Sequence, residues 1–167
     1  SGPRSRAILA SLTHGDVSDR GLPFMGCASI DVGPTSAVVA RLSLTGELGY
    51  EINVRAAQQY ALWQALMAAG TPLGMRPIGM RAQDSLRLEK GYGVWSLEFS
   101  TSCTPVMAGL ERFIAADKGD FIGREAFQAA LAAGPEMKLV LLQVESPEAD
   151  ATGYEPIHHD DKRIGYV

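Results

Sequence analysis

The chain has 167 residues, of which 46% are hydrophobic, 20% are charged and 7% are aromatic. This apolar fraction is large enough to build a core, and it excludes a disordered tail, a collagen and a low-complexity segment. Nineteen acidic and fifteen basic residues give a net charge of −4, which argues against a domain whose main task is to bind nucleic-acid phosphates.

The cysteines and the apolar runs indicate the cellular setting. Cys27 and Cys103 are far apart and belong to no CxxC motif or His/Cys cluster. We therefore expect two free, buried thiols, and neither a disulfide framework nor a zinc site. No apolar run approaches the roughly 20 residues that span a bilayer, and the first residues do not resemble a signal peptide. A reduced, cytoplasmic setting without a membrane partner is the default expectation.

The first half of the chain is predicted to alternate between helix and strand. A proline near the start and apolar residues on one face predict a helix that begins at Pro3 and ends by Gly15. Two strands joined by a Gly-Pro turn follow, then a third strand in which Tyr50 and Ile52 point one way and Glu51 the other. After it, the apolar spacing changes to that of a helix. The predicted ranges are 27–32, 35–43 and 48–54 for the strands and 56–69 for the second helix, whose apolar stripe is Tyr60, Trp63, Leu66 and Met67.

The second half contains fewer regular elements and becomes β-rich towards its end. Proline and glycine positions predict a helix over 77–90, and the remaining pattern predicts a short strand, a helix, a further strand and a terminal hairpin with Asp160 and Asp161 at its turn. We therefore divide the chain into an α+β part, 1–133, and a β-only remnant, 138–167. Because the chain does not begin with Met and its last strand has no closing turn, we expect a piece of a longer protein. The ranges of the last four elements are 112–115, 123–132, 138–145 and 156–167.

Glu51 is the strongest candidate for chemistry from pattern alone. It follows two glycines, Gly46 and Gly49, which permit unusual backbone torsions or the close approach of a ligand. On an inward face its carboxylate would have to be paired, and it can accept two parallel N–H bonds from an arginine or from the 2-amino-pyrimidinone edge of a heterocycle. The plain alternative is an exposed strand glutamate beside a tight hairpin.

The segment 81–92 is the second candidate. Asp84 can pair with Arg81 or Arg87 at a spacing of three residues along a helix. The alternative is a solvated charged face. Tyr92 and Trp95 follow the predicted helix end, where they could stack on a flat ligand or simply belong to the core.

The adjacent histidines His158 and His159 could suggest a metal site. Neighbouring strand residues point to opposite faces, so a polar hairpin tip is the better interpretation. The sequence contains no phosphate-binding glycine loop followed by lysine and no GxSxG motif.

Five segments stand in a fixed order along the chain: LTGELGYEINV (44–54), ALWQALMAAG (61–70), GMRAQDSLRLEKGYGVW (79–95), TPVMAGL (104–110) and DFIGREAF (120–127). Together they resemble the aminomethyltransferase (glycine cleavage T protein) family. Their order and register make the resemblance specific, and with GPRSRAIL near the start and KRIGYV at the end it covers nearly all of the chain. The segments EKGYGVW and WSLEF are most similar to the tetrahydrofolate-binding halves of dimethylglycine and sarcosine dehydrogenases.

The resemblance implies a fold, a cofactor and a set of site residues. The fold is α+β, a folate-binding, aminomethyltransferase-like portion followed by the first strands of a small β-barrel, and the cofactor is tetrahydrofolate, with FAD only in a preceding domain of the parent chain. Glu51 matches the family glutamate implied to bind the pterin, and Tyr50 is its aromatic neighbour. Tyr92 matches a pocket aromatic. Gln83 stands where the family often has a folate-contacting arginine, so the amide keeps hydrogen bonding without the charge.

The activity implied is one-carbon transfer from a small donor, such as an N-methyl amine, to the folate. The family's catalytic aspartate lies upstream of the segment that starts this chain, so we expect the 167 residues alone to be inactive. A non-catalytic folate-binding scaffold of the same fold is an alternative, although the cysteine-containing signature of such relatives is missing at 89–92. A demethylase of a sulfonium or methoxy substrate, and an interaction module that has lost its ligand because of Gln83, are the others.

Overall fold

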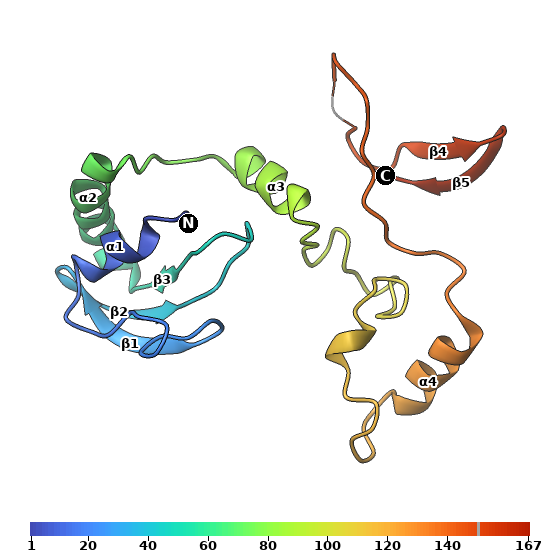
Figure 1. The fold of residues 1–167 in the computed structure, drawn as a ribbon, viewed down its shortest axis with the longest axis horizontal. Helices are drawn as coiled ribbons and strands as arrows, with labels where there is room; N and C mark the ends of the chain where they lie inside the picture. The colour runs from blue at the N-terminus through green and yellow to red at the C-terminus, as the bar shows by residue number, and fades with distance from the viewer. Residues whose placement is uncertain (150) are drawn as a thin grey trace. The chain divides into compact units, whose positions relative to one another are not determined.

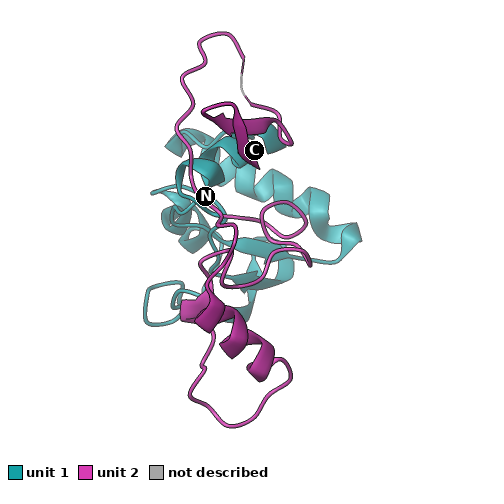
Figure 2. Ribbon diagram, turned by 90° about the vertical axis from the view of Figure 1, so that its right-hand side faces the viewer, with its two compact units in different colours: residues 1–92 teal, residues 93–167 magenta. Residues whose placement is uncertain are grey.

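A computed structural model describes residues 1–149 and 151–167. The chain forms two compact units, residues 1–92 and residues 93–167, which Figure 2 distinguishes by colour. No helix in the described residues is long and apolar enough to cross a membrane.

Unit 1 combines a three-stranded sheet with two packed helices. The strands lie in the order β1-β2-β3, and both pairs are antiparallel. The turn between β1 and β2 is closed by the Thr35 hydroxyl, which donates to the carbonyl of Val32 at 3.0 Å. The elements of this unit are α1 (Ser5–Ala10), β1 (Cys27–Val32), β2 (Thr35–Ala40), β3 (Glu51–Asn53), η1 (Ala56–Gln58), α2 (Gln59–Gly70), η2 (Thr71–Leu73) and α3 (Met80–Glu89).

The core of unit 1 lies between the sheet and the helices α1 and α2, which cover the same face of the sheet (Figure 1). Alternate residues of the strands point into it, as the period of two requires. Partly buried side chains, among them Tyr50, Ile52 and Leu66, pack around this core. Its buried members are Leu9 from α1, Val32, Ala37 and Val39 from the sheet, Leu62 from α2, and Val17 and Leu22 from the connecting loop.

Several predictions for unit 1 need correction. The first helix is only six residues long, because the Ser11 hydroxyl binds the Ile8 carbonyl and the Leu12 carbonyl turns to accept the amide of Gly33 at 2.6 Å. The residues that α2 turns to the core are Leu62 and Leu66, whereas Tyr60 is 71% exposed. The predicted stripe was therefore correct for Leu66, missed Leu62, and was wrong for Tyr60 and Trp63.

The prediction of buried thiols was also wrong. Cys27 is exposed, and Cys103 in unit 2 is partly exposed; both are free. Cys27 opens β1 on the face of the sheet that α1 and α2 do not cover, in register with exposed Ser29 and Asp31. Cys27 is exposed because successive strand residues point to opposite faces of the sheet, and not because of any property of the thiol.

Unit 2 has less regular structure than the sequence predicts. The predicted strand at 138–145 is wrong: the segment is extended, but its only backbone bond to another element among the described residues joins the Leu139 amide to the Met107 carbonyl at 2.8 Å. The predicted strand at 112–115 is a 3-10 turn instead. The elements of this unit are η3 (Glu111–Phe113), α4 (Arg124–Ala133), β4 (Pro156–His159) and β5 (Lys162–Tyr166).

The terminal hairpin confirms the sequence prediction. Strands β4 and β5 are antiparallel, with His159 opposite Lys162. The two turn residues, Asp160 and Asp161, have φ of +47° and +61°, which is the conformation that a two-residue hairpin turn requires.

Neighbouring valines in β2 provide a test of this arrangement. Val39 is fully buried against the core and Val38 is 43% exposed on the opposite face. Val39→Ala leaves a cavity and should lower the free energy of unfolding by about 2 kcal/mol, whereas Val38→Ala should cost under about 1 kcal/mol. Urea unfolding followed by circular dichroism measures both, and equal losses would contradict the assignment of faces.

Candidate functional site

The strand β3 places its two candidate residues on opposite faces of the sheet. Tyr50, just before the strand, and Ile52 turn towards α1 and α2, where they pack around the core. Glu51 and Asn53 are exposed on the other face. The alternation predicted from the sequence is therefore confirmed. Tyr50 and Glu51 do not point into one common pocket.

The Glu51 side chain is exposed, and no other described side chain binds its carboxylate. Among residues 1–149 and 151–167, no hydrogen bond or ion pair engages it. A free carboxylate on a paired strand can accept two parallel N–H bonds from a ligand without first breaking an internal interaction. The pairing of β3 with β2, with Ala40 opposite Glu51, fixes the backbone that carries it.

Tyr50 belongs to a hydrogen-bonded chain of charged residues. Its hydroxyl accepts from Nε of Arg6 at 3.1 Å, and Nη2 of the same guanidinium donates to Asp19 at 2.6 Å. Arg41 donates to the same Asp19 oxygen at 2.5 Å and also reaches the Leu22 carbonyl. The network thus ties α1, the loop before β1 and the end of β2 to the start of β3.

The same contacts shift two pKa values. The hydrogen bonds from Arg6, and then from Arg41, hold the pKa of the Asp19 carboxyl below its usual value of 3.8. The bond to the Tyr50 hydroxyl, followed by that to Asp19, raises the pKa of Arg6. Both charges are therefore retained at neutral pH.

The loop between β2 and β3 meets the end of α3, so the two candidate segments of the sequence are neighbours. Nζ of Lys90 lies 3.3 Å from Oε1 of Glu47. Gly46 has φ of +74°, and a Cβ there would stand 2.7 Å from Cγ of Lys90. Glycine is thus required at this position both by its torsion and by the approach of the lysine stem.

The end of α3 is a Schellman motif that fixes Tyr92. Gly91, at φ +67°, donates to the Leu88 carbonyl, and the amide of Tyr92 donates to the carbonyl of Arg87 at 2.9 Å. The Arg87 side chain is buried; its Nη1 donates to the Tyr92 carbonyl at 3.2 Å, and its Nε lies 3.5 Å from Asp84. The predicted pair of Asp84 and Arg87 is confirmed, and Arg87 does not lie on a solvated face.

The remaining predicted site residues are accessible but separate. Tyr92 is 42% exposed and Trp95, in unit 2, is 70% exposed, so neither is a core residue. Gln83 is half-buried in α3. Within the described part of the chain, no hydrogen bond or ion pair joins Gln83 or Tyr92 to Glu51.

A cavity that the sequence analysis missed lies on the helix side of β3, and we call it the helix-side cavity. It has a volume of about 490 Å³. Its walls come from α1, α2, β3 and the segment before α3, among them Tyr50, Ile52, Trp63, Leu66, Arg4 and Arg76. No sequence signal pointed to this cavity: Trp63 was predicted to belong to the apolar stripe of the helix, whereas it is half exposed.

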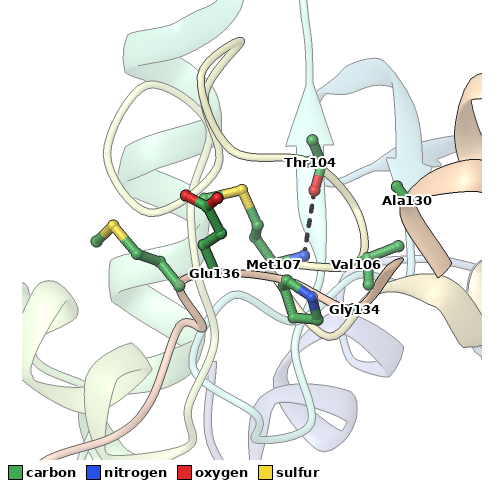
Figure 3. Close-up of a pocket in the computed structure, with 8 residues that line it drawn as sticks. Thr104, Val106, Met107, Ala130, Gly134 and Glu136 are labelled. Atoms are coloured by element: carbon green, nitrogen blue, oxygen red, sulfur yellow. Dashed lines mark hydrogen bonds between the residues drawn. The ribbon is translucent and has the colours of Figure 1, made fainter. Parts of the chain in front are cut away.

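Unit 2 has a smaller cavity, of about 280 Å³, shown in Figure 3. Its lining includes Val106, Met107 and Met137, and the Met107 amide donates to the Thr104 hydroxyl at 3.3 Å. Glu136 is its only charged lining residue among those described. It contains none of the predicted site residues. The described residues also include no group of three or more potential metal ligands, and His158 and His159 lie at the exposed hairpin tip.

Comparison with known proteins decides the family. The sequence profile described as the GCVT N-terminal domain matches residues 1–118, which include the whole of unit 1 and all four predicted site residues. The chain belongs to the GCVT N-terminal domain family.

Relatives of this GCVT-family chain include two kinds of protein. It is 37% identical over 165 residues to dimethylglycine dehydrogenase, mitochondrial, of Homo sapiens, covering 98% of this chain and 19% of that protein. It is 42% identical over 170 residues to the aminomethyltransferase of Streptomyces avermitilis, and the alignment covers 99% of this chain and 45% of that protein. The chain thus spans less than half the length of either relative.

A solved structure supports the same fold. The glycine cleavage system aminomethyltransferase T from Bartonella henselae matches with a TM-score of 0.66 and 28% sequence identity, covering 81% of this chain and 36% of that one. The mixed helix-and-sheet fold is therefore aminomethyltransferase-like, as the sequence predicts.

Gly46 of this GCVT-family chain is testable by substitution. Gly46→Ala forces a side chain into a left-handed torsion and against Lys90, and it should lower the free energy of unfolding by about 1–2 kcal/mol. Gly79→Ala is the matched control, because Gly79 has no atom within 4 Å of the added Cβ and no positive φ. Urea unfolding compares the two; a Gly46→Ala variant as stable as the Gly79→Ala variant would contradict the account.

The network around Asp19 predicts a pH dependence. Because its pKa is depressed in the folded state, its stabilising contribution is present above the unfolded-state value of 3.8 and is lost as the pH falls through the lower folded-state value. Between about pH 5 and about pH 2, the wild-type chain should therefore lose more stability than Asp19→Asn. Chemical unfolding at each pH measures this, with exposed Asp117→Asn as the control. Parallel curves for wild type and Asp19→Asn would refute the linkage.

Proposed function

We propose that this chain carries part of the pterin-binding site of a tetrahydrofolate-dependent one-carbon transferase. The observation that supports the proposal most strongly is the free carboxylate of Glu51, held on a paired strand within the segment 44–54 and inside the region matched to the family. The pattern of two N–H groups on a 2-amino-pyrimidinone edge is the complement of such a carboxylate.

Each predicted residue has its own role in the proposal. Glu51 accepts the paired N–H groups, the Gln83 amide supplies a neutral hydrogen-bonding group, and the exposed ring of Tyr92 offers a stacking surface. Tyr50, on the other face of β3, holds the strand in place through Arg6. The tetrahydrofolate, when bound, would supply the nitrogens that accept the one-carbon unit. The residues present fit this ligand because Glu51 and Tyr92 are exposed, Gln83 is half-buried, and Glu51 engages no other described residue.

We further propose that the parent protein acts on an N-methyl amine, as a dimethylglycine- or sarcosine-type dehydrogenase with its FAD in another domain. The alignment of nearly the whole chain with a dimethylglycine dehydrogenase supports this. The equally complete alignment with an aminomethyltransferase supports the alternative that the parent is a stand-alone aminomethyltransferase. A non-catalytic folate scaffold and a sulfonium or methoxy demethylase are the alternatives that the same fold allows.

In the same proposal, residues 1–133 belong to the folate domain and residues 138–167 begin a small β-barrel, for which the hairpin of β4 and β5 is the support. The free thiols support a cytoplasmic, reducing setting.

The test is calorimetric titration of the chain with 5-formyltetrahydrofolate, a stable reduced folate. Glu51→Gln replaces one acceptor oxygen by an amide and should weaken binding at least about tenfold, the cost of a lost charge-assisted hydrogen bond. Exposed Glu125→Gln is the matched control and should bind as the wild type does.

An analogue that lacks the 2-amino group sharpens this test. The wild-type chain should discriminate against the 2-desamino folate, and Glu51→Gln should lose that discrimination. Unchanged affinity of Glu51→Gln for the intact folate would rule out this residue as the pterin ligand.

A further inference from the structure

We propose that the helix-side cavity is a second binding site, for a small amphipathic carboxylate whose apolar part is a ring or a short chain. This goes beyond the folate proposal, because the cavity lies on the opposite side of β3 from Glu51. Its volume of about 490 Å³ is within the roughly 300–1,000 Å³ typical of small-molecule sites.

The walls of the cavity are apolar and include an exposed aromatic ring. Ile52, Leu66 and Met67 line it. Trp63 also lines it and is 48% exposed, whereas its neighbour in α2, Leu62, is buried in the core. A large ring left half exposed over an apolar hollow offers contact area to a flat or branched apolar group at little conformational cost.

The polar lining is positively charged. Arg4 and Arg76 both line the cavity, and none of the described residues that line it is acidic. Nη1 of Arg4 donates to the Leu73 carbonyl at 2.9 Å, which holds the side chain and leaves further N–H groups for another acceptor. Two guanidinium groups without a carboxylate among the lining residues favour an anion, and their planar fork suits a carboxylate.

The ring of Tyr50 adds to the apolar part of the lining. Its hydroxyl is directed to Nε of Arg6, which does not line the cavity. Apolar walls with two arginines thus match a molecule with an apolar body and a single carboxylate.

Tryptophan fluorescence can follow occupancy. The chain has two tryptophans, so Trp95→Phe leaves Trp63 as the only reporter. Titration of this variant with 4-phenylbutyrate should give a saturable change in Trp63 emission with a Kd of about 1 mM or tighter. The uncharged 4-phenylbutanamide should bind at least tenfold more weakly, a comparison that needs no further substitution.

Charge-neutral variants then locate the anion. Arg76→Gln and, independently, Arg4→Gln should each weaken 4-phenylbutyrate binding at least fivefold, while exposed Arg55→Gln, outside the cavity, should not change it. Glu51→Gln should leave this binding intact, so failure of the folate proposal and failure of this one are distinguishable. Absence of a saturable signal, equal binding of the amide, or unchanged affinity in both arginine variants would overturn the proposal.

Discussion

The strict alternation of side chains along β3 is the constraint on which the rest of unit 1 depends. Pairing with β2 in a fixed antiparallel register sends Ile52 and the preceding Tyr50 to the helices and Glu51 to the opposite face. A slip of one residue would exchange these faces and bury an unpaired carboxylate in the core, at a cost that a marginally stable domain cannot offset. The core, the helix-side cavity and the exposed carboxylate are three consequences of one register.

The loops around this strand are fixed by a second set of interactions, which are polar. Asp19 joins two arginines from different elements, and one of them holds the Tyr50 hydroxyl. On the other side, Gly46 lets the stem of Lys90 pass close to the loop that precedes β3. The start of β3 is therefore held from both directions, and this preorganises Glu51 without engaging its carboxylate.

Much of this arrangement was predictable from the sequence because it is set by local pattern. The strand at 27–32, the alternation in 50–53 and the hairpin with two aspartates at its turn follow from period and turn chemistry. What depends on tertiary partners was not predictable. The apolar run 138–145 has a strand-like sequence, yet it finds no strand to pair with among the described residues. Cysteine is a residue type that is usually buried, yet the position of Cys27 in β1 exposes it. The helix-side cavity is formed by residues from segments that are distant in the sequence, so no single motif predicted it.

The central claim is that the two faces of β3 have different tasks, with the pterin on the side of Glu51 and not on the side of Tyr50. A crystal structure of the chain with bound 5-formyltetrahydrofolate tests this most directly. The account predicts that the 2-amino group and the neighbouring ring N–H donate to the Glu51 carboxylate, on the sheet face that α1 and α2 leave uncovered. A pterin seated in the helix-side cavity against Tyr50, with Glu51 in solvent, would contradict it.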